Sequence, residues 1–105
     1  MGSISIACYR PKPGKTEELE AIVRGHVPIL RDAGLVTDRK PIIGRAKDGT
    51  IVEMFEWSSA EAIEKAHGNP EVLKLWGSFS EACEYVKLAD LAESLDLFAN
   101  FESVN

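Results

Sequence analysis

The order of its patterned segments limits most strongly how this 105-residue chain can fold. Residues 4–9 alternate between apolar side chains and small or polar ones, which predicts a strand. Residues 15–33 then place apolar side chains three and four positions apart, which predicts a helix that ends at Gly34. Pro28 lies inside this helix, and we expect it to cause a kink because proline lacks an N–H donor.

The middle of the chain predicts a β-hairpin. Asp48-Gly49 favours a tight turn because glycine accepts the positive φ that such turns require. The turn separates a strand predicted over residues 36–46 from one predicted over residues 50–57. Pro41 cannot donate to a sheet ladder, so we expect the earlier strand to be an edge strand. The later one is apolar on both faces, which is typical of a central strand.

A second helical region follows the hairpin. Ser58 as N-cap, with Glu61 three residues later, predicts a short helix that ends near residue 67. Asn69-Pro70 then begins a longer helix. The apolar stripe of that helix comprises Val72, Trp76, Phe79, Cys83 and Val86. Residues 88–95 fit either a further helical turn or a loop, and residues 96–104 predict a last strand.

The resulting order is strand, helix, strand, strand, helix, strand. With short connections and right-handed crossovers, it predicts one α+β domain over residues 1–105 with the ferredoxin-like βαββαβ fold. In that fold a four-stranded antiparallel sheet has both helices on one face. The first and third strands are central, and the second and fourth are edges, which agrees with the position of Pro41.

The sheet face away from the helices is expected to be apolar too. In residues 50–57, Ile51, Phe55 and Trp57 point one way, whereas Val52 and Met54 point the other. An exposed apolar sheet face marks a partner surface. We therefore expect a homodimer in which two sheets pack face to face and close a dimeric α+β barrel. The alternative is a solvated face with scattered apolar residues.

Composition limits the class of partner. The chain has 45% hydrophobic and 28% charged residues and a formal net charge of −5, which argues against nucleic acid because phosphate binding needs a basic face. No stretch has the length of a membrane span, and the N-terminus lacks the pattern of a signal peptide. Cys8 and Cys83 are expected to be free thiols in a reducing compartment. We therefore expect a cytoplasmic protein without nucleic-acid or membrane partners.

The two histidines are the first candidates for chemistry. His67 ends the short helix beside Gly68, where it could act as a general acid, a general base or a metal ligand because histidine titrates near neutral pH. The alternative is that it only caps the helix. His26 lies on the apolar stripe of the first helix, a position more typical of a core residue. Neither histidine has metal-ligand spacing with the other or with a cysteine, so we predict no metal site.

Aromatic and acidic residues supply the remaining candidates. Trp57, Trp76, Phe79 and Tyr85 either fill the core or form the walls of a pocket for a planar ligand between helix and sheet. Glu53 and Glu56, three apart in a strand, must point to opposite faces, so they cannot act as a pair. One of them needs a buried partner, which Arg45 or Lys47 across the hairpin could supply.

Two segments of the chain resemble a known family. Phe55-Glu56-Trp57 with its Ser58-Ser59 cap, followed by Ala66-His67-Gly68-Asn69-Pro70, is similar to the antibiotic biosynthesis monooxygenase-like domains of the dimeric α+β barrel superfamily. Trp76 resembles an aromatic residue that these domains carry several positions after the proline. The stretch from Tyr9 to Lys15, leading into a Glu-rich helix, is similar as well, and the element order covers essentially the whole chain.

The resemblance implies a homodimer with one pocket per subunit between helices and sheet. Some relatives are cofactor-free monooxygenases of polycyclic phenols or quinols, some degrade haem, and many have no known activity. For this chain it implies a protein that binds a small aromatic or apolar molecule without a cofactor. His67 would be the catalytic group, and Trp57, Trp76 and Phe79 would bind the ligand. A non-catalytic ligand-binding or protein-assembly module is the alternative, so whether the protein is an enzyme stays open.

This chain differs from these relatives at two places. Several of them carry a second histidine directly after the proline, where this chain has Glu71. Haem-degrading relatives pair a pocket histidine with an asparagine on the first strand, where this chain offers only Ser3, Ser5, Ala7 and Cys8.

Overall fold

The first strand and helix form where the sequence patterns predict them. In the computed structural model, which describes residues 2–105, β1 spans Ser3–Pro11 and α1 spans Thr16–Asp32. The helix continues through Pro28 without interruption, so proline inside the pattern does not end it. Gly34, at a φ of 73°, follows the helix end in the left-handed conformation that glycine favours.

The hairpin is confirmed. β2 (Ile42–Arg45) pairs antiparallel with β3 (Ile51–Trp57), and Ile42 lies opposite Met54. Gly49 has a φ of 92°, and its N–H donates to the carbonyl of Ala46 at 3.0 Å. β2 is shorter than predicted because Pro41 precedes it and does not lie within it.

The second helical region divides into two helices, as predicted. α2 spans Ala60–Ala66 and α3 spans Pro70–Ala82. The N-cap of α2 is Ser59 and not Ser58, because the Ser59 hydroxyl accepts from the N–H of Ala62 at 3.1 Å. Asn69 caps α3 as expected, through bonds from the N–H groups of Glu71 and Val72.

The C-terminal part differs most from the prediction. α3 ends at Ala82, and a strand, β4 (Cys83–Val86), begins at the next residue, where a helix was expected to continue. Cys83 already has extended φ and ψ angles of −149° and 171°. The strand forms because it can pair with β1, with Tyr85 opposite Tyr9. Backbone pairing therefore prevails over an apolar spacing that also fits a helix.

The end of the chain adds a fifth strand. Residues 88–95, left open between helix and loop, form two short 3-10 turns, η1 (Leu88–Asp90) and η2 (Ala92–Leu95). The strand expected over residues 96–104 is reduced to β5 (Glu102–Ser103), which pairs with β2. The sheet thus has five antiparallel strands and not four, in the order β4-β1-β3-β2-β5.

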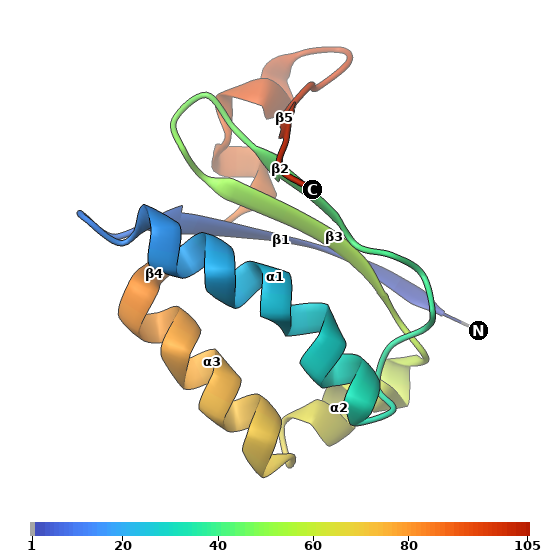
Figure 1. The fold of residues 1–105 in the computed structure, drawn as a ribbon. Coiled ribbons are helices and arrows are strands. Elements are labelled where there is room, and N and C mark those ends of the chain that lie inside the picture. Colours follow the sequence, from blue (N-terminus) through green and yellow to red (C-terminus); the bar gives the residue numbers. More distant parts are fainter. Residues whose placement is uncertain (1) are drawn as a thin grey trace.

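The helices and the C-terminal segment lie on opposite sides of the sheet. Figure 1 shows α1 and α3 side by side against one face, whereas the turns after β4 lie beyond the other. β1 and β3 are central, as predicted, but the expectation that the second strand is an edge is wrong, because β5 pairs with the outer side of β2. No helix within residues 2–105 is long and apolar enough to cross a membrane.

The two faces of β3 differ in what covers them. Ile51, Phe55 and Trp57 face the helices and are buried. On the other face Val52 packs with Cys8, Ala46 and Leu91 beneath the C-terminal segment. The rest of that face is open, and it exposes four large apolar side chains: Ile4 (60%), Ile6 (42%), Ile42 (64%) and Met54 (37%).

Candidate functional site

A cavity of about 600 Å³ lies between the helices and the sheet. Its size is that of a typical small-molecule pocket. All four residues singled out from the sequence line it: His67, Trp57, Trp76 and Phe79. The other side chains at its wall include Tyr9, His26, Phe55, Ile63 and Tyr85. The chain thus brings its two histidines and most of its aromatic residues to one place.

His67 caps α2, which is one of the roles considered for it from the sequence, and its ring also lines the cavity. It is the C-cap of α2, and its Nδ1–H donates to the carbonyl oxygen of Ile63 at 2.8 Å. The same ring lies edge-on against Trp76, with the ring centroids 5.0 Å apart. Because Nδ1 carries the hydrogen of that bond, the neutral ring leaves Nε2 as an acceptor. His67 is exposed, so it lies at the solvent side of the cavity.

The aromatic walls differ in burial. Trp57 and Phe79 are buried, and the Trp57 Nε1–H donates to the Ser5 hydroxyl at 3.0 Å. Trp76 is only partly buried, although its place on the α3 stripe predicts a core residue. It packs against both helix-side clusters and still reaches the cavity. The Trp76 side chain therefore packs against the core and also forms part of the cavity wall.

A buried polar group, made of Tyr9, His26 and Glu53, adjoins the cavity. Glu53 is fully buried, and its Oε1 accepts a hydrogen bond from the Tyr9 hydroxyl at 2.7 Å. The same oxygen lies 2.7 Å from Nδ1 of His26, which is 4% exposed. The expectation that Arg45 or Lys47 would supply the buried partner is wrong. Both lie at the far end of the hairpin, where the Arg45 side chain pairs with Glu20 and Glu102.

The polar group is enclosed by aromatic rings. His26 lies edge-on to Phe55 and Phe79, at centroid distances of 5.2 and 5.1 Å. Tyr9 stacks on Phe79 at 4.7 Å. Burial, followed by the adjacent Glu53 carboxylate, raises the pKa of Tyr9 well above its usual value. Its phenol therefore stays neutral and serves as a donor to Glu53.

Two polar atoms of this group have no hydrogen-bond partner within residues 2–105: His26 Nε2 and Glu53 Oε2. Buried polar atoms are nearly always paired, and leaving one unpaired costs about 1–3 kcal/mol. The group is thus incompletely satisfied beside a cavity.

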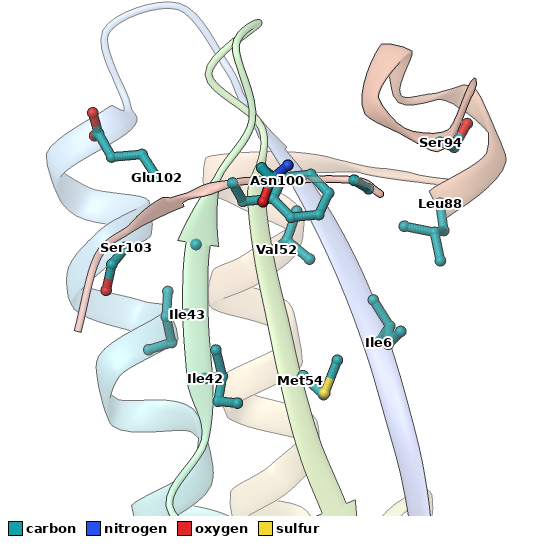
Figure 2. Close-up of a pocket in the computed structure, with 13 residues that line it drawn as sticks. Ile6, Ile42, Ile43, Val52, Met54, Leu88, Ser94, Asn100, Glu102 and Ser103 are labelled. Atoms are coloured by element: carbon teal, nitrogen blue, oxygen red, sulfur yellow. The ribbon is translucent and has the colours of Figure 1, made fainter. Parts of the chain in front are cut away.

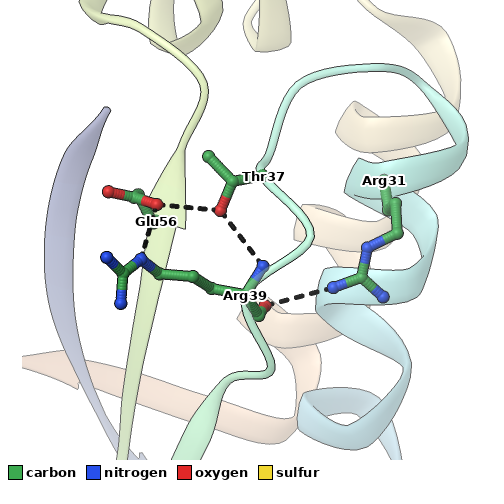
Figure 3. A network of polar contacts seen from close by, with 4 residues as sticks. All are labelled: Arg31, Thr37, Arg39 and Glu56. Atoms are coloured by element: carbon green, nitrogen blue, oxygen red, sulfur yellow. Dashed lines mark hydrogen bonds and ion pairs between the residues drawn. The ribbon is translucent and has the colours of Figure 1, made fainter. Parts of the chain in front are cut away.

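Glu56 points to the opposite face, as its spacing from Glu53 requires. Its Oε1 accepts from the Thr37 hydroxyl and from Arg39 Nε, each at 2.9 Å (Figure 3). Arg31 in turn donates to the carbonyl of Arg39 at 3.2 Å. This network fastens the segment between α1 and β2 to β3. It is largely exposed and lies outside the cavity, so we assign it a structural role.

A second cavity, of about 530 Å³, lies on the open sheet face. Figure 2 shows Ile6, Val52, Met54 and Ile42 lining it from three strands, with the segment around Asn100 crossing one end. It contains no histidine, cysteine or tyrosine. This surface is therefore suited to apolar packing and not to proton chemistry.

No group of three histidine, cysteine or acidic side chains within residues 2–105 could hold a metal ion. Cys8 and Cys83 are both free and buried. Burial raises the pKa of each thiol, which disfavours the reactive thiolate.

The sequence did not bring Tyr9, His26 and Glu53 together. They come from β1, α1 and β3, and the shortest separation between bonded members is 27 positions. A signal was nevertheless present for His26 and Glu53, since each is a polar residue at an inward position of an apolar pattern, whereas Tyr9 stands with Ser5 and Ala7 on the small or polar side of the β1 alternation. Inward polar residues must find partners, so these two are candidates to meet each other.

No protein-family model matches the sequence, and a comparison with curated protein sequences returns no match. Among solved structures, the chain is similar to the structure of Rv0793 from Mycobacterium tuberculosis, with a TM-score of 0.63. The two are 19% identical, and the alignment covers 88% of this chain and 99% of that one. At this identity the likeness shows a shared small α+β fold.

Proposed function

We propose that this protein binds a flat aromatic or apolar small molecule in the cavity between helices and sheet, as a homodimer of the ferredoxin-like dimeric α+β barrel type. The observation that carries the proposal is the cavity itself. It gathers Trp57, Trp76 and Phe79 with two histidines around one open cavity of about 600 Å³. Pockets that are mostly apolar with a few polar groups are typical of small-molecule sites.

The shape of the wall favours a planar ligand. Phe79 and Trp57 present buried ring surface, and Trp76 covers the cavity from α3 while remaining partly exposed. Aromatic side chains favour offset or edge-on contact with other rings. A charged or strongly polar ligand would instead lose hydration against these walls, with few groups to replace it.

The open sheet face supports the homodimer. Four exposed apolar side chains of the open face lie on three adjacent strands: Ile4, Ile6, Ile42 and Met54. A contiguous apolar patch of this kind marks an interaction surface. A second copy is the fitting occupant because two such faces are complementary when packed sheet to sheet.

The catalytic form of the proposal is cofactor-independent monooxygenation of a reduced polycyclic phenol or quinol. With a phenol, one oxygen atom of O₂ becomes a ring carbonyl at a C–H carbon, and the other leaves as water with the hydrogens of that C–H and of the hydroxyl, so the substrate supplies all four electrons. The resemblance of residues 55–70 to antibiotic biosynthesis monooxygenase-like domains supports this chemistry. His67, at the solvent side of the cavity, would remove or orient the substrate's proton.

The binding proposal is tested with 1-methoxynaphthalene, a flat ligand without a donor, measured by titration calorimetry. We expect saturable binding that the variant Ala7→Leu weakens at least tenfold, because Ala7 lines the cavity and a larger side chain would fill it. Leu73→Ala on the outer side of α3, where Leu73 is 48% exposed, is the matched control and should bind normally. Absence of saturable binding to any fused-ring aromatic would refute the proposed pocket.

The homodimer is tested by sedimentation at micromolar concentration. We expect about twice the chain mass of 11.5 kDa. Ile42→Asp with Ile6→Asp should give a folded monomer because both side chains are exposed in the single chain and would meet a partner. Leu73→Asp controls for the loss of one exposed leucine elsewhere. A wild-type monomer at this concentration would exclude the barrel.

Oxygen consumption separates enzyme from module. A panel of fused-ring quinols should be screened against the wild-type protein, and His67→Ala should lower any turnover by about 10²-fold or more. If no quinol is turned over while ligand binding is retained, the protein is a non-catalytic binding module.

A further inference from the structure

The most exposed large apolar side chains lie close together near the C-terminus. Leu95, Leu97 and Phe98 are 87%, 91% and 78% exposed, more than any other large hydrophobic residue within residues 2–105. They belong to one short segment, residues 95–98, which we call the tip. Single exposed leucines are common, but three large apolar side chains within four positions mark a contact surface.

The chain on both sides of the tip is fixed to the sheet. Before it, Leu91 is buried in one cluster with Val52, and Glu93 Oε2 accepts from the N–H of Lys47 at 2.8 Å. After it, Phe101 packs against the same cluster, and β5 pairs with β2. The fold therefore presents the tip at a defined place above the open sheet face.

This C-terminal segment covers only one end of the open face. Figure 2 shows it crossing the sheet near Val52, whereas Met54 and Ile42 lie beyond it. Along β1 the covered end is at Cys8, and the exposed Ile4 lies four residues away, a distance of about 13 Å in a strand. The end of the face around Ile4 and Ile42, which we call the free end, is therefore left without cover.

The free end and the tip are complementary in polarity and in charge. The free end holds a cavity of about 220 Å³, and its lining residues include Ile4, Arg39, Lys40, Ile42, Met54 and Glu56. Arg39 pairs with Glu56 at 2.9 Å, so Lys40 leaves an excess positive charge there. The tip carries a negative charge at Asp96. The ion pairs within residues 2–105 involve neither Lys40 nor Asp96.

The cover on one end limits how two copies can pack face to face. Packed sheets lie about 10 Å apart, and a layer of chain such as the C-terminal segment occupies much of that gap. Two covered ends that faced each other would hold the sheets apart. If each covered end instead lies over the free end of the other copy, both sheets are covered along their length. A two-fold axis across the strands gives this arrangement, and every contact then occurs twice.

We propose that the tip of each copy docks on the free end of the other. Its apolar side chains lie against Ile4 and Ile42, and Asp96 lies beside Lys40 of the partner subunit. The inference rests on the proposed homodimer and deepens it, because it names the segment that crosses between the subunits. The partner's chain then covers the apolar surface that a single copy exposes.

The first test removes the apolar part of the tip, and sedimentation at several concentrations measures the dimer dissociation constant. Leu97→Ser with Phe98→Ser should weaken the dimer roughly a hundredfold or more, because two large side chains in each copy lose their contacts. Both side chains are exposed in the single chain, so the variant should fold. Leu73→Ser, on the outer side of α3, is the matched control and should leave the dissociation constant unchanged.

The second test exchanges the charges. Asp96→Lys and Lys40→Asp should each weaken the dimer, roughly tenfold at low salt, and the double variant should regain most of the loss. The chain has a net charge of −5, so a general charge effect would make Asp96→Lys strengthen the dimer. Asp32→Lys, with the same charge change at the end of α1, is the control and should not weaken it.

The outcomes separate this contact from the barrel itself. A monomeric wild-type protein would refute both. If the wild-type protein is a dimer but the Leu97 and Phe98 variant keeps its dissociation constant, or if the double charge variant shows no rescue, the tip contact is wrong. The proposed homodimer then still stands, provided that Ile42→Asp with Ile6→Asp gives a monomer.

Discussion

The Tyr9 hydroxyl is the simplest place to test whether the buried polar group stabilises the fold. Tyr9→Phe removes only the oxygen that donates to Glu53 at 2.7 Å, while the ring can still stack on Phe79. A hydrogen bond to a charged group contributes about 1.5–3 kcal/mol. The free energy of unfolding should fall by that amount, because the buried carboxylate would keep only its bond with His26.

The assay is urea unfolding at one fixed protein concentration, since dimerisation would add a concentration-dependent term. With a slope of about 1–3 kcal/mol per molar urea for a chain of this size, the midpoint should fall by roughly 1 M. Tyr85→Phe is the matched control: Tyr85 is 59% exposed, and its change should stay within about 0.5 kcal/mol.

A double-mutant cycle isolates the bond from the rest of the substitution. In a Glu53→Leu background Tyr9 has lost its acceptor, so the further change to phenylalanine should cost almost nothing. The coupling should be at least about 1 kcal/mol. A Tyr9→Phe cost no larger than that of the Tyr85 control, or a coupling near zero, would show that Glu53 does not depend on Tyr9.

Three further predictions follow from the same structure. Ser59→Ala should cost about 1 kcal/mol of unfolding free energy and Ser58→Ala much less, because only the Ser59 hydroxyl caps α2; thermal unfolding of the two variants decides this. The raised pKa of Tyr9 means that the folded state keeps a proton that the unfolded chain loses above about pH 10. The free energy of unfolding should therefore decline above that pH by up to about 1.4 kcal/mol per pH unit, and Tyr9→Phe should lack this decline. Trp76→Ala should cost about 2 kcal/mol, less than the roughly 3–5 kcal/mol of a fully buried aromatic, and should weaken 1-methoxynaphthalene binding; equal affinity in calorimetry would remove Trp76 from the pocket wall.

The sequence predicts the elements whose local signals agree with their tertiary setting. The hairpin follows from Gly49, which needs positive φ, and from the apolar pattern of β3. The start of α3 follows from Asn69, whose side chain satisfies the first N–H groups. These signals depend on a few neighbouring residues, so they can be read without knowing the fold.

β4 could not be predicted because its signal is ambiguous. Phe79, Cys83 and Val86 are spaced four and three positions apart, as on a helix face. No glycine or proline separates α3 from the strand, and the change of conformation at Cys83 depends on pairing with distant β1. The alternation in residues 96–104 predicts a longer strand than the one that forms. Only Glu102 and Ser103 make up β5, which pairs with β2.

The candidate site was predictable in its walls but not in its polar centre. The wall residues recur at positions that helix and strand periods place inward, so Trp57 and Phe79 could be identified. Either Glu53 or Glu56 was expected to need a buried partner, but the partners of Glu53 come from β1 and α1, not from the adjacent hairpin strand. Which distant elements meet at a buried carboxylate depends on packing that no local spacing encodes.

The position of β1 between β3 and β4 has a consequence for the rate at which the chain folds. Its closest ladder partner in sequence is Ile51, opposite Tyr9, and its pairs with β4 join still more distant residues such as Cys8 and Val86. Closing such long loops costs conformational entropy before the contacts between their ends can stabilise the chain, and this slows folding. We expect the β2–β3 hairpin to form early, and the chain to cross its main barrier when β1 enters the sheet and carries Tyr9 to Glu53.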